Sequence, residues 1–268
     1  MGGSRGNAHL IALIGILMEQ FRPENRSVAR KGLGWFYRKL KRGQGIAPFY
    51  LPPQQAKAMT PRGVVAELFF DHTGRTINKW THYLKHYEQF FSRFVNAPVR
   101  MLEIGVFEGG SLELWRRYLG PQATIFGIDI DPACAAKVDL PNQVRIGSQD
   151  DPDFLRTVVE EMGGVDLVLD DGSHKGSHII ASFRALFPLL SDGGLYVIED
   201  MHADYSEFPG TRRNQSLSFI KRLIDDMHGP YHGLEPQETP HVGGLHVFDS
   251  MAFIEKAEQH RTANTNVP

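Results

Sequence analysis

Two pairs of adjacent acidic residues each follow directly on a mainly apolar run. Asp170 and Asp171 follow Val165–Leu169, and Glu199-Asp200 follows Leu195–Ile198. If both runs are neighbouring parallel strands, about 4.8 Å apart, their carboxylates meet at the strand ends where open α/β sheets bind ligands. Close carboxylates repel one another unless a cation or protons lie among them. Because oxygen ligands without cysteine favour a hard cation, the pattern predicts Mg²⁺ and not Zn²⁺.

A histidine lies close to the first acidic pair. His174 comes three residues after Asp171. Histidine exchanges protons near neutral pH, so beside a metal-bound hydroxyl it is a candidate general base. His178 follows at i+4 and raises the alternative of a zinc pair, but the His-Glu-x-x-His frame of such pairs is missing. A second alternative is that the acids only cap helices or pair with arginines.

The elements that must position these residues begin with a glycine-rich loop. A predicted strand, Val99–Ile104, leads through the loop into a helical pattern at Leu112–Tyr118. Glycines let the backbone approach a ligand closely, and the helix N-terminus offers free N–H groups. The spacing Glu103-x-Gly105-x-x-x-Gly109 is not the dinucleotide G-x-G-x-x-G and resembles the first motif of class I S-adenosylmethionine (SAM) methyltransferases. The candidate cofactor residues here are Glu103, Gly105, Gly109 and Ser111.

The remaining elements predict an α/β fold with a seven-stranded, mostly parallel, Rossmann-like sheet and helices on both faces. Its second strand ends at Asp129, about twenty residues after the glycine loop, where such sites place a carboxylate for the ribose hydroxyls. The other expected strands are Val144–Ile146, Val165–Leu169, Leu195–Ile198 after a turn at Ser191–Gly194, and a final antiparallel pair broken at Asp249-Ser250. The expected helices are Val64–Phe94 with a break at Gly74, Pro152–Met162 capped by Asp150 or Asp151, Ser177–Leu190 and Gln215–Met227.

The lead-in to the first strand is rich in aromatic residues and histidine. Helical spacing explains Trp80, Tyr83 and Tyr87 as residues that face the core. The same argument gives His82 and His86 structural roles.

Composition excludes several classes of protein. The 268 residues carry a formal net charge of −2, which gives no reason to expect a nucleic-acid partner. The single cysteine, Cys134, cannot form an internal disulfide, suits a cytoplasmic location and is expected to be a buried, unreactive thiol. The most apolar run, Leu10–Met18, is shorter than the roughly 20 residues that span a bilayer, so no transmembrane segment is predicted.

Three parts are expected along the chain: an N-terminal helical extension and linker at 1–62, a catalytic domain at 63–256 and a polar tail at 257–268. The helix expected at Leu10–Phe21 has more apolar surface than a free helix exposes, which predicts a homo-oligomer. The basic and aromatic stretch Lys31–Arg42 is either a membrane-surface helix or, as we favour, a packed helix with a solvated charged face.

Taken together, the motifs resemble one family. Over residues 75–256 the chain is similar to the metal-dependent sugar O-methyltransferases of macrolide biosynthesis, the mycinamicin type. His82-Tyr83 and Tyr87-Glu88 also resemble the family's lead-in. The motifs that carry the resemblance are Leu102–Gly105, Ser111–Trp115, Ile125–Asp129, Gln149–Leu155, Asp170–His174 and Tyr196–Asp200.

The resemblance implies a role for each candidate residue. Asp171, Glu199 and Asp200 would hold Mg²⁺, and His174 would be the general base. The methionine part of SAM would lie at Glu103 and Gly105 and its ribose at Asp129, while Ser148 and Gln149 would flank the adenine and Asp170 would also belong to the cofactor pocket. Apart from the resemblance, we expect the polar segment 201–213 to form a lid that closes over the acceptor and excludes water.

Two features differ from the family and leave the acceptor open. The N-terminal region is shorter than in the macrolide enzymes, and the stretch Lys31–Arg42 has no counterpart there. The acceptor is therefore a macrolide, an aromatic polyketide glycoside, or a surface polysaccharide or glycolipid. The alternatives are a catechol-type O-methyltransferase, a nicotinamide oxidoreductase, which the glycine spacing disfavours, and a non-catalytic binding or scaffold protein.

Overall fold

The computed structural model describes residues 51–205 and 215–257. Contacts divide the chain between Gln55 and Ala56, and we describe the unit that begins at Ala56. The predicted helix Leu10–Phe21, the stretch Lys31–Arg42, most of the predicted lid and nearly all of the polar tail lie outside the described residues. Among the helices that the structure describes, none is both long and apolar enough to cross a membrane.

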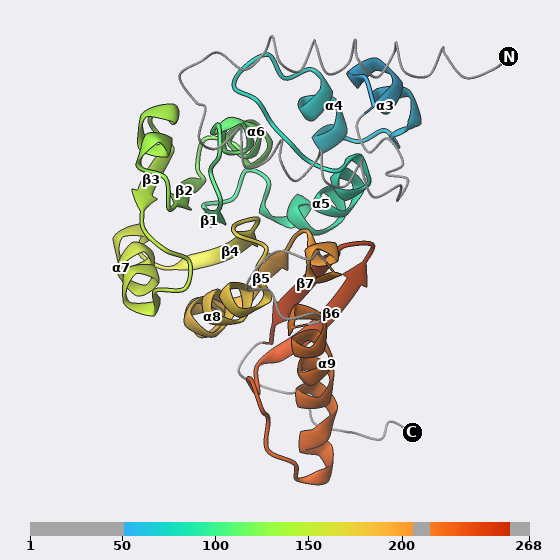
Figure 1. Cartoon of the computed structure of the whole chain (residues 1–268), viewed down its shortest axis with the longest axis vertical. Helices are drawn as coiled ribbons and strands as arrows, with labels where there is room; N and C mark the ends of the chain where they lie inside the picture. The colour runs from blue at the N-terminus through green and yellow to red at the C-terminus, as the bar shows by residue number, and fades with distance from the viewer. Residues whose placement is uncertain (1–50, 206–214, 258–268) are drawn as a thin grey trace, which may run out of the picture. The chain divides into compact units, whose positions relative to one another are not determined.

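A seven-stranded mixed sheet forms the centre of this unit (Figure 1), as the sequence predicted. The strand order is β3-β2-β1-β4-β5-β7-β6, in which β1 to β5 are parallel and β7 and β6 are antiparallel to their neighbours. Strands β1, β2 and β4 are mostly apolar and buried, because helices cover both faces of the sheet, whereas the edge strand β3 is partly exposed. The strands are β1 Arg100–Ile104, β2 Thr124–Asp129, β3 Gln143–Ile146, β4 Val165–Asp170, β5 Leu190–Ile198, β6 Val242–Phe248 and β7 Met251–Lys256.

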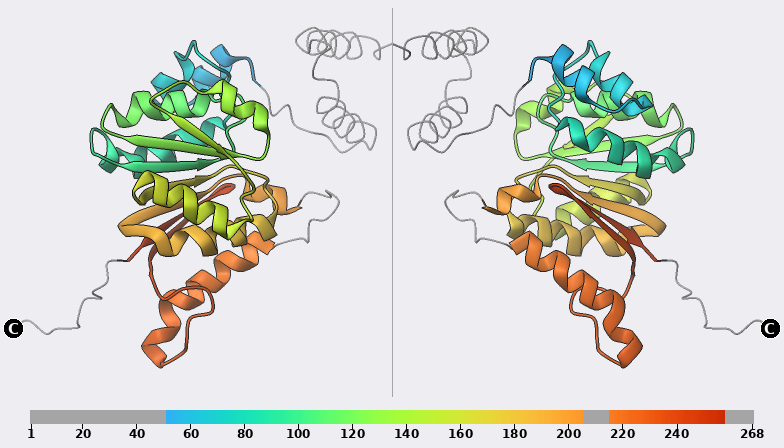
Figure 2. Two further views of the ribbon diagram at one scale, coloured as in Figure 1. Left: turned by 90° about the vertical axis from the view of Figure 1, so that its left-hand side faces the viewer. Right: turned by 90° about the vertical axis from the view of Figure 1, so that its right-hand side faces the viewer.

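Helices pack on both faces (Figure 2) and bury two separate apolar clusters. One cluster joins α4, α5 and α6 to alternate residues of the sheet, such as Met101 and Leu167. The other joins α7, α8 and α9 to the intervening residues, such as Leu102 and Val168. The α-helices are α3 Pro53–Met59, α4 Val64–Phe70, α5 Leu84–Phe91, α6 Gly110–Leu119, α7 Pro152–Met162, α8 Gly176–Leu186 and α9 Gln215–His228. The 3₁₀ turns are η2 Thr81–Tyr83, η3 Ser92–Phe94, η4 Pro132–Lys137, η5 Phe187–Leu189, η6 Met201–Tyr205 and η7 Gly229–His232.

Local sequence explains why α7 begins and ends where predicted. The Asp151 carboxylate accepts hydrogen bonds from the N–H groups of Asp153 and Phe154, and Pro152 occupies the first helical position. The helix ends at Gly163, whose φ of 75° is left-handed. Of the two predicted caps, Asp151 is therefore the one that is used.

The structure differs from the sequence prediction most clearly in three places. Helix α8 ends at Leu186 and not at Leu190, because Pro188 cannot continue the helical hydrogen bonds. Strand β5 already begins at Leu190, and the expected turn Ser191–Gly194 is a bulge within it, since β4 pairs first with Leu190 and then with Leu195. The segment 76–80 is not helical, and its chain runs against the start of α6, where a Cβ on Gly110 would lie 2.3 Å from the Arg75 carbonyl oxygen.

Candidate active site

The backbone of β4 and β5 brings the two acidic pairs to one edge of the sheet. Asp170 is paired with Ile198, so that Asp171 and Glu199 follow at the same level on adjacent strands. The Asp171 N–H donates to the Ile104 carbonyl at 3.0 Å, and the Glu199 N–H donates to the Asp170 carbonyl at 3.0 Å. The predicted convergence of the acids therefore follows from the register of three parallel strands.

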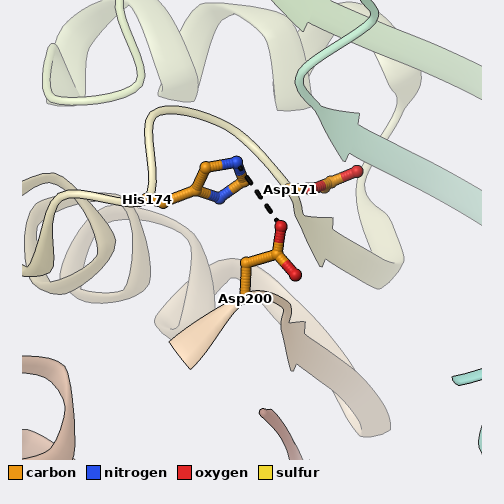
Figure 3. Close-up of side chains that lie close together, drawn as sticks. All are labelled: Asp171, His174 and Asp200. Atoms are coloured by element: carbon orange, nitrogen blue, oxygen red, sulfur yellow. Dashed lines mark ion pairs between the residues drawn. The ribbon is translucent and has the colours of Figure 1, made fainter. Parts of the chain in front are cut away.

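Asp171, His174 and Asp200 form a compact group at this edge (Figure 3). Each offers one ligand atom, and these atoms lie within 4.8 Å of one another. The imidazole of His174 points toward Asp200, with 3.7 Å between Nε2 and Oδ2. Both His174 and Asp200 have a φ of 54°, a left-handed conformation that costs a non-glycine residue about 1–2 kcal/mol. Such strain is concentrated at functional sites, because the surrounding structure must hold it in place.

Glu199 lies deeper than the group and is bound to a lysine. Its side chain is buried, and both carboxylate oxygens accept hydrogen bonds from Lys79 Nζ, at 2.9 and 3.0 Å. The same ammonium donates to Asp171 Oδ2 at 2.6 Å and lies 3.6 Å from Glu103 Oε1. Burial disfavours the charge on Lys79, but the three carboxylates together raise its pKa well above the usual value. No sequence motif indicates a role for Lys79, which lies in the non-helical segment 76–80.

Two tyrosines orient the consecutive acids after β5. Tyr83 donates its hydroxyl hydrogen bond to Asp200 Oδ1 at 2.8 Å, and Tyr87 donates a short one to Glu199 Oε1. Both rings are buried, as helical spacing predicted, yet the same spacing gave no indication that their hydroxyls reach the site. A buried tyrosine needs a hydrogen-bond partner for its O–H group. That requirement could have indicated from the sequence that these hydroxyls bind polar groups.

The donor set and its charge fit a divalent cation. Asp171 and Asp200 offer carboxylate oxygens close together, which are the ligands of Mg²⁺. Burial and the neighbouring Asp171 raise the pKa of Glu199, and Lys79 opposes that rise. Lys79 supplies one positive charge beside three acids, so the site favours either protonation of an acid or a further cation. Asp171, Glu199 and Asp200 are the residues that would hold the cation.

The glycine loop packs directly against the acidic edge. Gly105 has a φ of 94°, and a Cβ there would lie 2.2 Å from the Asp171 carbonyl oxygen. Glu103 is fully buried and accepts a hydrogen bond from Ser111 Oγ at 2.9 Å, which links β1 to the start of α6. Burial raises its pKa to about 7, although Lys79 opposes the rise. Glu103 Oε1 has no hydrogen-bond partner among residues 51–205 and 215–257, which fits a ligand amino group such as that of SAM.

Asp129 at the end of β2 is bound to the same loop. Its Oδ2 accepts the N–H groups of Val106 and Phe107 at 2.9 and 3.1 Å, and Oδ1 accepts the N–H of Asp131. Burial would raise the pKa of Asp129, but these backbone N–H groups outweigh it and lower the pKa. A permanently charged acceptor at this point fits the predicted contact with ribose hydroxyls. Gly109, with a φ of 85°, lets the loop turn into α6.

Asp170, which is predicted to belong to the cofactor pocket, is bound to protein groups in the structure. Its side chain is buried, and its carboxylate accepts hydrogen bonds from Gln149, Ser182 and Tyr196. It therefore turns inward, away from Asp171, because successive side chains of an extended chain point to opposite sides. The bond to Ser182 ties the end of β4 to α8, and the place of Asp170 in the cofactor pocket stays a prediction.

Gln149 also engages protein groups at both ends of its amide. Nε2 donates to Asp170 at 3.1 Å, and Oε1 accepts the Ser173 N–H at 2.6 Å. Gln149 thus connects the loops that follow β3 and β4, while the neighbouring Ser148 binds Asp150. Both residues lie at the same edge of the sheet as the glycine loop. Their contact with the adenine of SAM stays a prediction.

Comparison with known proteins shows similarity to methyltransferases. Residues 102–201 match the family described as "Methyltransferase domain". The chain is 37% identical over 219 residues to a tetracenomycin-C 3'-O-methyltransferase of Streptomyces olivaceus, covering 75% of this chain and 56% of the relative. It is 38% identical over 193 residues to mycinamicin VI 2''-O-methyltransferase of Micromonospora griseorubida, covering 64% of this chain and 47% of the relative.

A solved structure shows the same likeness. MycE methyltransferase from the mycinamycin pathway, in complex with Mg, SAH and mycinamycin VI, aligns with a TM-score of 0.65 and 34% identity over 74% of this chain and 54% of that one. The chain thus spans about half the length of the relatives that it matches. Residues 102–201 thus carry a methyltransferase domain within a class I methyltransferase fold, and the chain is similar to enzymes named for O-methylation in the tetracenomycin and mycinamicin pathways.

Proposed function

We propose that this protein transfers the methyl group of SAM to a hydroxyl of a sugar on a glycosylated natural product or glycan, with Mg²⁺, through the domain at 63–256. The group of Asp171, His174 and Asp200 beside the glycine loop is the single observation that carries the proposal. The similarity to enzymes named for sugar O-methylation supports the class of acceptor.

The residues of the site divide the chemistry among them. A divalent cation held by Asp171, Glu199 and Asp200 would act as a Lewis acid toward neighbouring sugar oxygens. His174 takes the proton of the attacking hydroxyl at Nε2, and Asp200, 3.7 Å away, stabilises the resulting imidazolium. Glu103 would hold the methionine part of SAM and Asp129 its ribose, and together they would orient the methyl donor toward the hydroxyl. General-base help of this kind is worth roughly 10²–10⁴-fold.

A sugar hydroxyl needs such a base more than a phenol does. An alcohol is far less acidic than a catechol, and it becomes a good nucleophile only when a group such as His174 removes its proton. We therefore propose sugar hydroxyls over catechols as acceptors. Assays of a rhamnosylated aromatic polyketide, a glycosylated macrolide and a catechol, each with SAM, compare the two classes directly.

The decisive experiment pairs removal of the base with removal of the metal. The His174→Ala substitution should lower turnover on the glycoside by at least about 100-fold. Calorimetry should show that the variant binds SAM with the same affinity as the wild type. EDTA should abolish wild-type turnover, and added Mg²⁺ should restore it. His178→Ala is the matched control, because His178 lies four residues along, bonds to Ser173 and Asp150, and has no part in the proposed chemistry.

The outcomes separate the competing interpretations. Full activity of the His174→Ala variant removes this residue from the mechanism. Turnover that survives chelation contradicts metal dependence. Tight SAM binding without transfer to any hydroxyl acceptor would make the chain a binding or scaffold protein, and binding of NADH in place of SAM would make it an oxidoreductase.

A further inference from the structure

Lys79 has an environment that the proposed chemistry does not explain. Its side chain is 2% exposed, although lysine is almost never fully buried without partners. It comes from the loop between α4 and η2, and its ammonium lies among Glu103 of β1 and the acids that follow β4 and β5. A lysine buried in this way has its charge compensated wholly by the site residues.

The partners of Lys79 are the carboxylates assigned to the metal. Nζ lies 2.6 Å from Asp171 Oδ2 and 2.9 Å from Glu199 Oε1. A divalent cation bound by these oxygens would be a second positive centre within a few ångströms of the ammonium. Two cations at that separation repel each other, most strongly where water is excluded. The lysine and the metal therefore compete for the same two acids.

We propose that Lys79 is a tethered counter-ion of the metal-free site, which holds Asp171 and Glu199 together without Mg²⁺ and weakens the affinity of the site for Mg²⁺. This inference rests on the proposed use of Asp171 and Glu199 as metal ligands. It adds that the folded domain does not depend on metal, because one side chain of the chain itself stabilises the acidic edge. The same side chain sets how much Mg²⁺ is needed to load the site.

The test measures stability and metal binding in place of turnover. Lys79→Met keeps the apolar stem and removes the charge, and the full chain is purified in Mg²⁺ and then dialysed against EDTA. Removing one partner of a buried ion pair is strongly destabilising, so the variant in EDTA should unfold about 5–15 °C below the wild type. Adding 10 mM MgCl₂ should recover most of that loss in the variant and shift the wild type by only about 1–2 °C.

Mg²⁺ titration by calorimetry, without SAM or acceptor, gives the second readout. The Lys79→Met variant should bind Mg²⁺ at least about 10-fold more tightly than the wild type, because a competing charge is gone. Lys57→Met is the control, since Lys57 makes an exposed ion pair with Asp71 and should change neither value. Lys79→Gln, whose amide can still donate to Asp171, serves if the methionine variant does not fold, and it should show the same tightening.

The results that would contradict the role of Lys79 differ from those that would contradict the proposed function. If the wild type binds Mg²⁺ and both Lys79 variants bind it equally well or more weakly, Lys79 is not a competitor and the inference is wrong. Unchanged stability of Lys79→Met in EDTA contradicts it as well. If the wild type itself binds no Mg²⁺, the proposed metal site fails first, and the competition fails with it.

Discussion

His86 shows how burial changes the chemistry of a single residue. Its ring is buried and stacks on Phe248, with 3.8 Å between centroids and 23° between planes. Burial, together with the nearby charges of Lys85 and His82, lowers the pKa of His86 to about 4. Within the described part of the chain, Nδ1 has no hydrogen-bond partner. The ring therefore acts as an aromatic core residue, which is the structural role that the sequence predicted.

Replacing His86→Phe should make stability less dependent on pH. The folded state holds the imidazole neutral down to about pH 4, whereas the unfolded chain protonates it at the ordinary pKa of 6.5. The contribution of His86 to the free energy of unfolding is therefore fully present above pH 6.5 and is lost progressively as the pH falls from 6.5 to 4. Below pH 4 it changes no further. Urea unfolding of both proteins from pH 7.5 to 4 should show the wild type losing more free energy than the variant. Parallel pH profiles would contradict the assignment.

At the scale of elements, the contact between the β1 loop and the end of β4 shapes the site. Gly105 combines a left-handed φ of 94° with a backbone oxygen 2.2 Å from any added Cβ. That oxygen belongs to Asp171, so a side chain at 105 would push the glycine loop and the acidic edge apart. The cofactor loop and the proposed metal ligands therefore depend on one close approach of two backbones.

Gly105→Ala should weaken SAM binding and lower thermal stability together. The matched control is Gly163→Ala, which has a comparable φ of 75° but no atom within 4 Å of the added methyl group. Both variants bear the cost of a left-handed alanine, about 1–2 kcal/mol, and only the first adds the clash. Calorimetric titration with SAM should show at least about a 10-fold loss for Gly105→Ala, a conservative figure for a forced backbone shift, and none for the control. Equal losses in both would mean that the close approach does not matter.

At the scale of the whole unit, the two apolar clusters on opposite faces of one sheet favour cooperative unfolding. Cys134, the single cysteine of the chain, offers a probe of that behaviour. It is 2% exposed, and its Sγ donates to the Phe107 carbonyl at 3.3 Å. Burial and the charge of Asp129 raise the pKa of the thiol to about 12. The structure thus agrees with the buried, unreactive thiol that the sequence predicted.

Iodoacetamide should modify native Cys134 at pH 8 at least about 100-fold more slowly than the unfolded chain, because both thiolate formation and access are suppressed. Intact-mass spectrometry against time, with and without 6 M guanidinium chloride, measures the two rates. A native rate close to the unfolded one would show that η4 opens independently of the sheet.

The sequence by itself determined most of the elements, their order and the edge of the sheet at which the acids gather. Apolar periodicity and glycine spacing are local properties, and carboxylates such as Asp171 directly after a parallel strand must lie at its carboxyl end. Only the tertiary structure decided which groups balance the negative charge of these carboxylates. Lys79 contacts Asp171 and Glu199, which lie 92 and 120 residues later in the sequence. The hydroxyls of Tyr83 and Tyr87 also bind the acids, although helical spacing predicted only that these two residues face the core. No local sequence pattern predicts the contacts of Lys79, Tyr83 and Tyr87 with the acids, because these residues and the acids are far apart in the sequence. The contacts form only when the folded chain packs these segments together.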